Sequence, residues 1–219
     1  MDYYAPYKKA LSTAQMQVNA VWLRNYLQAQ GWSLNAIAAA LGNWQSECTL
    51  NPNRPQHAGF PSDGTGGFGL PQWTPWRKKY GSWCTSQGIG FTANDSNPSG
   101  RFEPQIAYHD YECINGINGK KTWYSSNGYS YRWQQWKTST DDVRRLATAY
   151  YWQYERSAAM NPGSRPDQAA AWYSYLSGQP YSPISGVGFP GNPFIKSTFS
   201  IGNLRLVYLY LIMIILSRR

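Results

Sequence analysis

The chain has 219 residues, which is enough for one domain with a sizeable hydrophobic core and an appendage, but short for two large domains. Only 14% of the residues are charged whereas 16% are aromatic, with 18 Tyr and 11 Trp, and this composition excludes a disordered chain. The net charge of +9 predicts an anionic partner, such as nucleic acid or an anionic cell wall, or merely a solvated basic surface. Because the basic residues are scattered in pairs, without zinc-finger spacing or an RNA-binding signature, we expect no recognition of nucleic-acid sequence.

The cysteines and the N-terminus bear on the cellular compartment. Cys48, Cys84 and Cys113 are an odd number, so they predict no disulfide framework, although a single bridge stays open. The opening MDYYAPYKKA lacks the charged segment and apolar stretch of a secretory signal. We therefore expect a protein that works inside a cell or that something else carries out.

Two helices are predicted first. Residues Thr13 to Gln30 carry apolar side chains three and four apart, and Gly31 follows as a stop signal. Ser33 suits the N-cap of a second helix, which must end by Pro52 because the residue before a proline avoids the helical region. Glu47, in "GNWQSECTLNP", therefore falls in the last turn of this helix or just past it.

The middle of the chain is predicted to be mostly loop. Residues 53–76 predict a loop and a short β-wing, because "SDGTGGFGLPQWTP" alternates glycines with apolar residues as small hairpins do. Residues 81–100 are again predicted as loop. A helix is expected over 103–113, with Pro104 in its first turn, and Asn127-Gly128 predicts a second tight turn.

The second half has one strong helix prediction, from Asp141 to Arg156. Thr140 and two acidic residues open it, and acids suit the positive end of the helix dipole. A further helix is predicted from Ser164 to Leu176. Half of the residues from 178 to 193 are Gly or Pro, which predicts a domain boundary there.

The predicted organisation is thus a domain over residues 1–177, a Gly/Pro-rich linker over 178–203 and a hydrophobic tail over 204–219. The apolar run from Leu206 to Leu216 is shorter than the roughly 18 to 20 residues that span a bilayer. A buried strand, an interfacial anchor and an aggregation-prone stub stay open. The terminal Arg218 and Arg219 favour contact with an anionic membrane surface.

A helical domain with a small β-wing and an acid at a helix end has the layout of a glycan-cleaving site. Cleavage of a glycosidic bond needs a carboxyl group that keeps its proton near neutral pH, and burial against apolar and aromatic walls achieves this. Trp44, Phe68 and Trp73 are the candidate walls around Glu47.

The motifs "GNWQSECTLNP" and "GGFGLPQWTP" together resemble the phage tail lysozyme family, whose modules open peptidoglycan during genome delivery. The looser pattern is also similar to soluble lytic transglycosylases and goose-type lysozymes. The resemblance covers roughly Leu11 to Leu176. It implies a mainly α (α+β) fold: a lysozyme-like helical domain with a small β-hairpin wing.

The resemblance also implies roles for individual residues. Glu47 matches the catalytic acid of the family, and Gln72 matches the glutamine that lies beside the bound sugar in transglycosylases. Gly66, Gly67 and Gly69 match the turn that lets the backbone approach the glycan. The predicted substrate-binding residues are accordingly Gln72, Trp73, Phe68, Gly69 and Trp44.

A second carboxylate decides the mechanism. A separation of about 5 Å between the two carboxyl groups predicts retention, and about 6.5 to 9.5 Å predicts inversion. Asp63 in "PSDGTGG" is the first candidate, with a turn-forming role as the alternative. The segment Tyr154 to Ser157 resembles Tyr-Glu-Arg-Pro of the family. We interpret Glu155 and Arg156 as a structural ion pair at a helix end, with a position lining the cleft as the alternative.

Other functions are weighed against this one. A cysteine peptidase needs a thiolate paired with His, but no cysteine has a recognisable nucleophile context, and the two His and three Cys match no zinc pattern. A lytic transglycosylase and a non-catalytic wall-binding module keep the fold and stay open. "GFPGNPFIKSTF" resembles the start of a metallopeptidase module, but no His or Asp follows it to form a metal site.

The sequence therefore predicts a muramidase without a cofactor, carried at the tip of a phage tail and acting on the host cell wall. The predicted partners are bacterial peptidoglycan and phage tail proteins.

Overall fold

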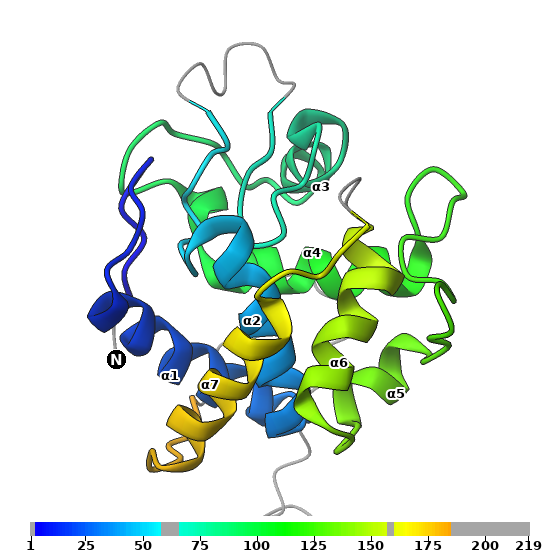
Figure 1. Cartoon of the computed structure of the whole chain (residues 1–219). Coiled ribbons are helices and arrows are strands. Elements are labelled where there is room, and N and C mark those ends of the chain that lie inside the picture. Colours follow the sequence, from blue (N-terminus) through cyan, green and yellow to red (C-terminus); the bar gives the residue numbers. More distant parts are fainter. Residues whose placement is uncertain (1–2, 58–65, 157–159, 185–219) are drawn as a thin grey trace, which may run out of the picture. The chain divides into compact units, whose positions relative to one another are not determined.

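The computed structural model describes residues 3–57, 66–156 and 160–184, which belong to one unit of the chain, whereas the second unit, residues 188–219, lies outside them. Seven α-helices form in the described residues (Figure 1), which confirms the predicted mainly helical fold. In chain order the elements are α1 (Thr13–Ala29), α2 (Leu34–Cys48), η1 (Trp76–Lys78), α3 (Tyr80–Ser86), η2 (Pro98–Gly100), α4 (Phe102–Asn115), α5 (Trp133–Thr138), α6 (Val143–Tyr150), the π-helical η3 (Tyr151–Glu155) and α7 (Arg165–Ser177).

Helix α2 is the central element of this domain. It contacts α1, α5, α6 and α7, and Figure 1 shows α1, α6 and α7 around it. Every residue from Ala36 to Leu41 is fully buried, and most of them are alanines. Because alanine is small, neighbouring helices approach α2 from several sides, and this packing fixes the position of its C-terminal turn.

The boundaries of α1 and α2 agree with the signals in the sequence. Gly31 follows α1 in the left-handed conformation, with φ of 84°, and the Ser33 hydroxyl accepts a hydrogen bond of 3.0 Å from the backbone N–H of Ala36. Helix α2 ends at Cys48, so Glu47 lies in its last turn, as predicted. Thr49 and Leu50 are both left-handed, with φ of 55° and 54°, which is a strained arrangement for non-glycine residues.

The predicted β-wing is present in a reduced form. No strand forms among the described residues, and single antiparallel bridges join Phe68 to Pro55 and to Trp73. Left-handed residues at Gly69 and Gln72 interrupt the pairing within a few residues, and residues 58–65 of the predicted loop and wing lie outside the described chain. Aromatic packing holds the wing together instead, in a second core cluster of Phe68, Trp73, Trp76, Tyr80, Cys84 and Tyr108.

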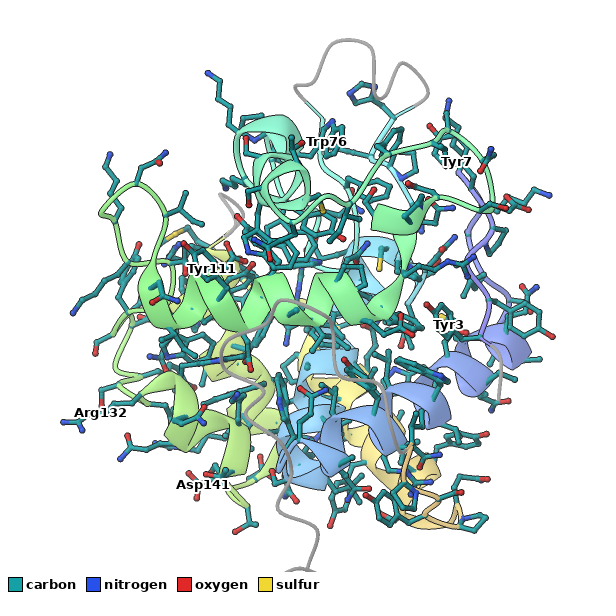
Figure 2. The ribbon with its side chains drawn as sticks, turned by 180° about the vertical axis from the view of Figure 1, so that it is seen from behind. Tyr3, Tyr7, Trp76, Tyr111, Arg132 and Asp141 are labelled. Carbon is teal, nitrogen blue, oxygen red and sulfur yellow. The ribbon has the colours of Figure 1, made fainter. Side chains whose placement is uncertain are left out.

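Helix α4 links the wing to the rest of the domain. Figure 2 shows α4 crossing the back of the molecule, with Tyr111 on it and with Trp76 on the side of the wing. Pro104 lies in the first turn of α4, as expected, where its missing N–H leaves no intrahelical hydrogen bond unmade.

Two local predictions were wrong, and one short helix was not predicted. The segment predicted as loop over 81–100 contains α3, whose Gly81 lies so close to Trp76 that an added Cβ would stand 2.6 Å from its indole ring. The short α5 was not predicted. Helix α6 starts later than expected, because Asp142 rather than Thr140 caps it by accepting a hydrogen bond of 2.9 Å from the N–H of Arg145.

The predicted tight turn is confirmed. Asn127 and Gly128 both have positive φ, of 48° and 81°, between the bridged residues Ser126 and Tyr129. Most of the predicted linker (178–203) and the whole tail (204–219) lie beyond residue 184, outside the described residues. In the part of the chain that the structure describes, no helix is long and apolar enough to cross a bilayer.

Candidate active site

Glu47 forms an ion pair with Arg165, the first residue of α7. Arg165 Nη2 donates to Glu47 Oε1, and the two side chains are only 21% (Glu47) and 15% (Arg165) exposed. A carboxylate in the last turn of a helix lies at the negative end of the helix dipole, which disfavours its charge. The guanidinium of Arg165 places a positive charge against this carboxyl group.

Gly42 explains why α7 begins beside Glu47. A Cβ atom at position 42 would lie 2.5 Å from the carbonyl oxygen of Arg165 and 2.7 Å from the backbone nitrogen of Ala169. Only glycine allows this close approach of the two backbones. Side chains continue the contact, since Ser46 Oγ donates to Gln168 Oε1 at 2.8 Å.

A second carboxyl group, that of Glu155, lies at the end of the π-helical segment that follows α6. The N–H of Arg156 donates to the carbonyl of Tyr151, five residues earlier, at 2.8 Å. Single π-helical turns of this kind occur frequently at functional sites. The guanidinium of Arg165 lies 5.2 Å from the centre of the Tyr151 ring, so this segment faces the start of α7.

The environment of Glu155 is unusual for a carboxyl group. Its Oε1 atom is buried and has no hydrogen-bond partner among the described residues. Arg165 Nε is likewise buried and has no hydrogen-bond partner there. Burial raises the pKa of Glu155 well above its ordinary value, the nearby charge of Glu47 raises it further, and Arg165 opposes both effects. We call Glu47, Glu155 and Arg165 the acid cluster.

The aromatic residues predicted as walls are buried. Trp44, Phe68 and Trp73 expose at most 3% of their surface. Trp44 Nε1 donates to Tyr150 Oη at 2.9 Å, and Trp73 Nε1 donates to Glu112 Oε1 at 2.5 Å. In this conformation their ring faces are covered by other side chains.

The polar wing residues are engaged with the wing itself. Gln72 Nε2 donates to the carbonyls of Arg54 and Gly69, both at 2.9 Å. Gly69 has φ of 83°, and a Cβ there would lie 2.7 Å from Gln105 Oε1. Asp63, the predicted second carboxylate, lies outside the described residues.

Two members of the acid cluster were not predicted from the sequence. Arg165 carries no local signal, because the residue that it contacts lies far away in the chain. Glu155 carries a local sequence signal, the Tyr-Glu-Arg segment, but we interpreted Glu155 as the partner of Arg156 in an ion pair. The structure records no such pair among the described residues: Arg156 donates to the carbonyls of Thr122 and Gln153, and its guanidinium lies 4.0 Å from the centre of the Tyr124 ring.

The cysteines and His109 are buried in the described part of the chain. All three cysteines are free and buried, and burial followed by the charge of Glu47 raises the pKa of the Cys48 thiol. Burial also lowers the pKa of His109 to about 3, so this imidazole is neutral. The described residues hold no group of three or more His, Cys, Asp or Glu side chains that suits a metal ion.

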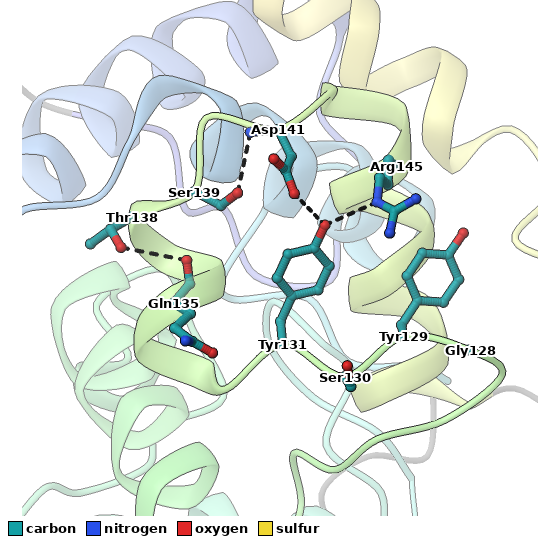
Figure 3. Close-up of a pocket in the computed structure, with 9 residues that line it drawn as sticks. All are labelled: Gly128, Tyr129, Ser130, Tyr131, Gln135, Thr138, Ser139, Asp141 and Arg145. Carbon is teal, nitrogen blue, oxygen red and sulfur yellow. Dashed lines mark hydrogen bonds between the residues drawn. The ribbon is translucent and has the colours of Figure 1, made fainter.

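A separate pocket of about 530 Å³ lies near the start of α6 (Figure 3). Tyr131 Oη donates to Asp141 Oδ2 at 2.5 Å and accepts from Arg145 Nε at 3.1 Å. The two charged side chains of this pocket, Asp141 and Arg145, therefore already have a hydrogen-bond partner. Arg145 and Glu155 are separated along α6 and η3 by about 15 Å, at about 1.5 Å per residue. The pocket is therefore distinct from the acid cluster. It is lined by Gly128, Tyr129, Ser130, Tyr131, Gln135, Thr138, Ser139, Asp141 and Arg145.

Comparison with known proteins agrees with the resemblance noted in the sequence. The family model described as phage tail lysozyme matches residues 18–176, which include every member of the acid cluster. The chain is also similar to morphogenesis protein 1 of Bacillus phage B103, with 32% identity over 180 residues. This match covers 82% of the chain and 45% of the relative, so the chain spans less than half of that protein's length.

Proposed function

This chain belongs to the phage tail lysozyme family, and on that premise we propose that it hydrolyses the glycan strands of bacterial peptidoglycan with Glu47 as the proton donor. The observation that carries the proposal is the acid cluster, in which Glu47 pairs with the guanidinium of Arg165 in the last turn of the central helix α2, and the charges of both residues act on the carboxyl group of Glu155. Pairs of carboxyl groups in environments that favour different protonation states are what acid catalysis of glycoside cleavage requires.

The chemistry follows from the leaving group. As the bond between C1 and the glycosidic oxygen breaks, its electron pair stays on the oxygen, which must take a proton to leave as a neutral hydroxyl. Glu47 is the cluster member whose motif resembles that of the catalytic acid of the family, and its side chain is partly exposed, so a glycan can reach it. Water then adds to C1 in a hydrolase.

The remaining residue assignments from sequence are part of the proposal. The sequence assigned Trp44, Phe68 and Trp73 to substrate binding; because their side chains are buried, we propose that they support the site from within the core instead. Gln72 and Gly69 shape the wing backbone that faces the glycan. Asp63 as the second carboxylate opposite Glu47 stays a prediction.

We further propose that the protein acts from the virion. The name of the relative from phage B103 associates that protein with morphogenesis, and the family name places its members in phage tails. A location at the tail tip, contact with phage tail proteins and contact of the C-terminal tail with a membrane surface are proposals on this basis.

The test is Glu47→Gln in a peptidoglycan clearing assay. Removal of the proton donor should lower the rate by about 10²- to 10⁴-fold, because that is the usual contribution of a general acid. Glu103→Gln is the matched control, since Glu103 is a partly buried acid on α4 that accepts a hydrogen bond of 2.7 Å from Tyr3 Oη. Equal thermal stability of both variants would show that the loss comes from chemistry.

Mass analysis of the released fragments separates the related activities. A reducing muramic acid end supports the muramidase, and an anhydro sugar indicates a lytic transglycosylase. If wild type and Glu47→Gln bind walls equally and neither releases fragments, the protein is a wall-binding module and the proposal is wrong.

A further inference from the structure

The pocket of about 530 Å³ near the start of α6 is lined by polar groups with unused hydrogen-bonding capacity (Figure 3). Gln135 Oε1 accepts from the backbone N–H of Arg132 at 3.2 Å, whereas Gln135 Nε2 has no hydrogen-bond partner among the described residues. Arg145 uses Nε for its bond to Tyr131, and its two Nη atoms have no partner in the described chain. These groups are therefore available to a ligand.

Buried side chains hold the segment that lines this pocket in place. Gln153 is fully buried, and its side chain accepts from the N–H of Tyr131 at 3.2 Å and donates to the carbonyl of Tyr131 at 2.9 Å. Trp123 Nε1 donates to the same carbonyl at 2.8 Å. The partly buried rings of Tyr129 and Tyr131 pack against the main hydrophobic core, and Figure 3 shows both rings on the same side of their segment. A site ordered in advance loses less conformational entropy when it binds a ligand.

The chemistry of the lining indicates the class of ligand. Its charged residues are Asp141 and Arg145, one of each sign, so the lining does not favour a simple anion or cation. An apolar ligand would remove water from the polar groups without replacing their hydrogen bonds, which is costly. A sugar ring carries hydroxyl groups that donate and accept, next to C–H groups that pack against aromatic rings. The hydroxyl, amide, carboxylate and guanidinium groups beside two tyrosine rings therefore suit a saccharide.

We propose that this pocket binds a saccharide unit of the bacterial wall glycan, at a site separate from Glu47, and so holds the enzyme on its substrate. The choice of the wall glycan as the source of the saccharide rests on the proposed function. The fit of the pocket to a saccharide rests on its own lining.

Helix α2 connects the two sites. Asn35 in the first turn of α2 donates to the carbonyl of Asp141 at 3.0 Å, whereas Glu47 lies in the last turn. The twelve residues between these positions span about 18 Å, at about 1.5 Å per residue. The pocket and Glu47 are thus at opposite ends of one buried helix. Contact at a second point raises the effective concentration of glycan at the first, without any new contact to the bond that is cut.

The first test locates binding directly. Full-length Glu47→Gln labelled with ¹⁵N, which should not cleave the ligand, is titrated with short soluble fragments of wall glycan freed of their stem peptides. We expect saturable shifts of the backbone amide signals of Tyr129, Ser130 and Ser139. Shifts confined to the surroundings of Glu47, or no shifts at all, would overturn the inference.

A parallel titration with the free stem peptide separates two parts of the wall. The peptide should leave the amide signals of Tyr129, Ser130 and Ser139 unchanged. If the peptide shifts these signals and the glycan fragments do not, the pocket takes peptides and the inference is wrong.

Substitution of Tyr129 tests the aromatic contact in the same Glu47→Gln background. Tyr129→Ala removes the ring and should weaken binding of the glycan fragments at the pocket by about tenfold, whereas Tyr129→Phe keeps the ring and should stay within about threefold. Tyr173→Ala is the matched control, because Tyr173 is an exposed tyrosine on α7 outside the pocket. Equal affinities of Tyr129→Ala and Tyr173→Ala would contradict a saccharide contact at this ring.

Substitution of Gln135 tests the unused donor. Gln135→Met has a similar volume but no amide, and it should weaken binding at the pocket by about threefold to tenfold, as the loss of one hydrogen bond does. Gln134→Met is the control, because Gln134 is the adjacent exposed residue of α5 and does not line the pocket. Thermal unfolding shows whether each variant stays folded. If folded Gln135→Met binds as tightly as Gln134→Met, the inference is wrong.

The inference and the proposed function fail in different ways. If the wild type releases no wall fragments while the glycan still shifts the pocket signals, the proposed hydrolysis is wrong and the saccharide site stands. If the wild type cleaves walls through Glu47 and the pocket signals do not respond, only the saccharide site is wrong.

Discussion

At the scale of single residues, Glu112 connects the wing to the region around the acid cluster. It is 2% exposed, and its carboxyl group accepts hydrogen bonds from Trp73 of the wing and from Tyr154 of η3. Burial raises the pKa of Glu112 to about 7, although both hydrogen bonds oppose the shift. The folded state therefore holds a proton at Glu112 that the unfolded chain loses at lower pH.

This difference predicts how stability depends on pH. The contribution is fully present below the ordinary pKa of 4.5 and is lost as pH rises from there through about 7, because between these two values ionisation is favoured only in the unfolded chain. At about 1.4 kcal/mol per pKa unit, the loss is on the order of 3 kcal/mol. Glu112→Gln should remove this pH-dependent contribution. The difference in the free energy of unfolding between variant and wild type should therefore change by a value on the order of 3 kcal/mol between pH 5 and pH 8.

Denaturant unfolding at several pH values checks this prediction, with Glu103→Gln as a control that should follow the wild type. Parallel stability curves for Glu112→Gln and wild type would show that Glu112 titrates in the ordinary range. The comparison of variant with wild type cancels the groups that titrate independently of Glu112, whereas Glu155 responds to the charge of Glu112 and contributes to the measured difference.

At the scale of elements, the contact between α2 and α7 determines whether the acid cluster forms. Gly42→Ala should gain about 1 kcal/mol in helix propensity, but the added Cβ would meet backbone atoms of α7 at 2.5 to 2.7 Å. Overpacking of this kind costs about 1 to 3 kcal/mol. We expect a net loss of stability and, because Arg165 moves with α7, a lower rate of wall cleavage.

Gly90→Ala is the matched control for this prediction, because a Cβ added at Gly90 would meet no atom within 4 Å and the backbone there has no positive φ. Thermal unfolding and the clearing assay measure the two effects. If Gly42→Ala is as stable and as active as Gly90→Ala, close backbone approach at position 42 does not position Arg165.

The elements also show how far the sequence can predict this protein. Local signals predicted α1, α2 and the turn at Asn127-Gly128, because caps, periodicity and turn residues act within a few positions. Helix α3 was missed because its stability comes from packing of Tyr80 and Cys84 in the wing cluster rather than from helix propensity. The ion pair of Glu47 with Arg165 could not be predicted, since it depends on the packing of two helices far apart in the chain.

In the candidate site too, features set by local signals could be predicted from the sequence, whereas features set by the packing of distant segments could not. The placement of Glu47 at a helix end was predictable from Pro52 and the helical pattern, and the structure confirms it. The roles of Trp44 and Trp73 could not be deduced locally, because burial depends on the whole domain. An aromatic residue next to a motif is equally consistent with a binding face and with a core position.

At the scale of the whole molecule, the net charge of +9 should attract the protein to anionic cell walls. Salt screens this attraction, since the Debye length falls from about 10 Å at 0.1 M to about 3 Å at 1 M ionic strength. We expect binding to isolated walls and the rate of clearing to fall together as salt rises. The Glu47→Gln variant should show the same loss of binding, because it keeps the basic surface and lacks only the proposed proton donor.

Two controls make the salt prediction specific. Thermal unfolding at each salt concentration shows whether the protein stays folded, and walls stripped of their anionic polymers remove the partner charge. Long-range attraction predicts a steep salt dependence on intact walls and a weak one on stripped walls. A flat response on intact walls would mean that contacts within the glycan site, rather than the charge of the molecule, hold the protein on its substrate.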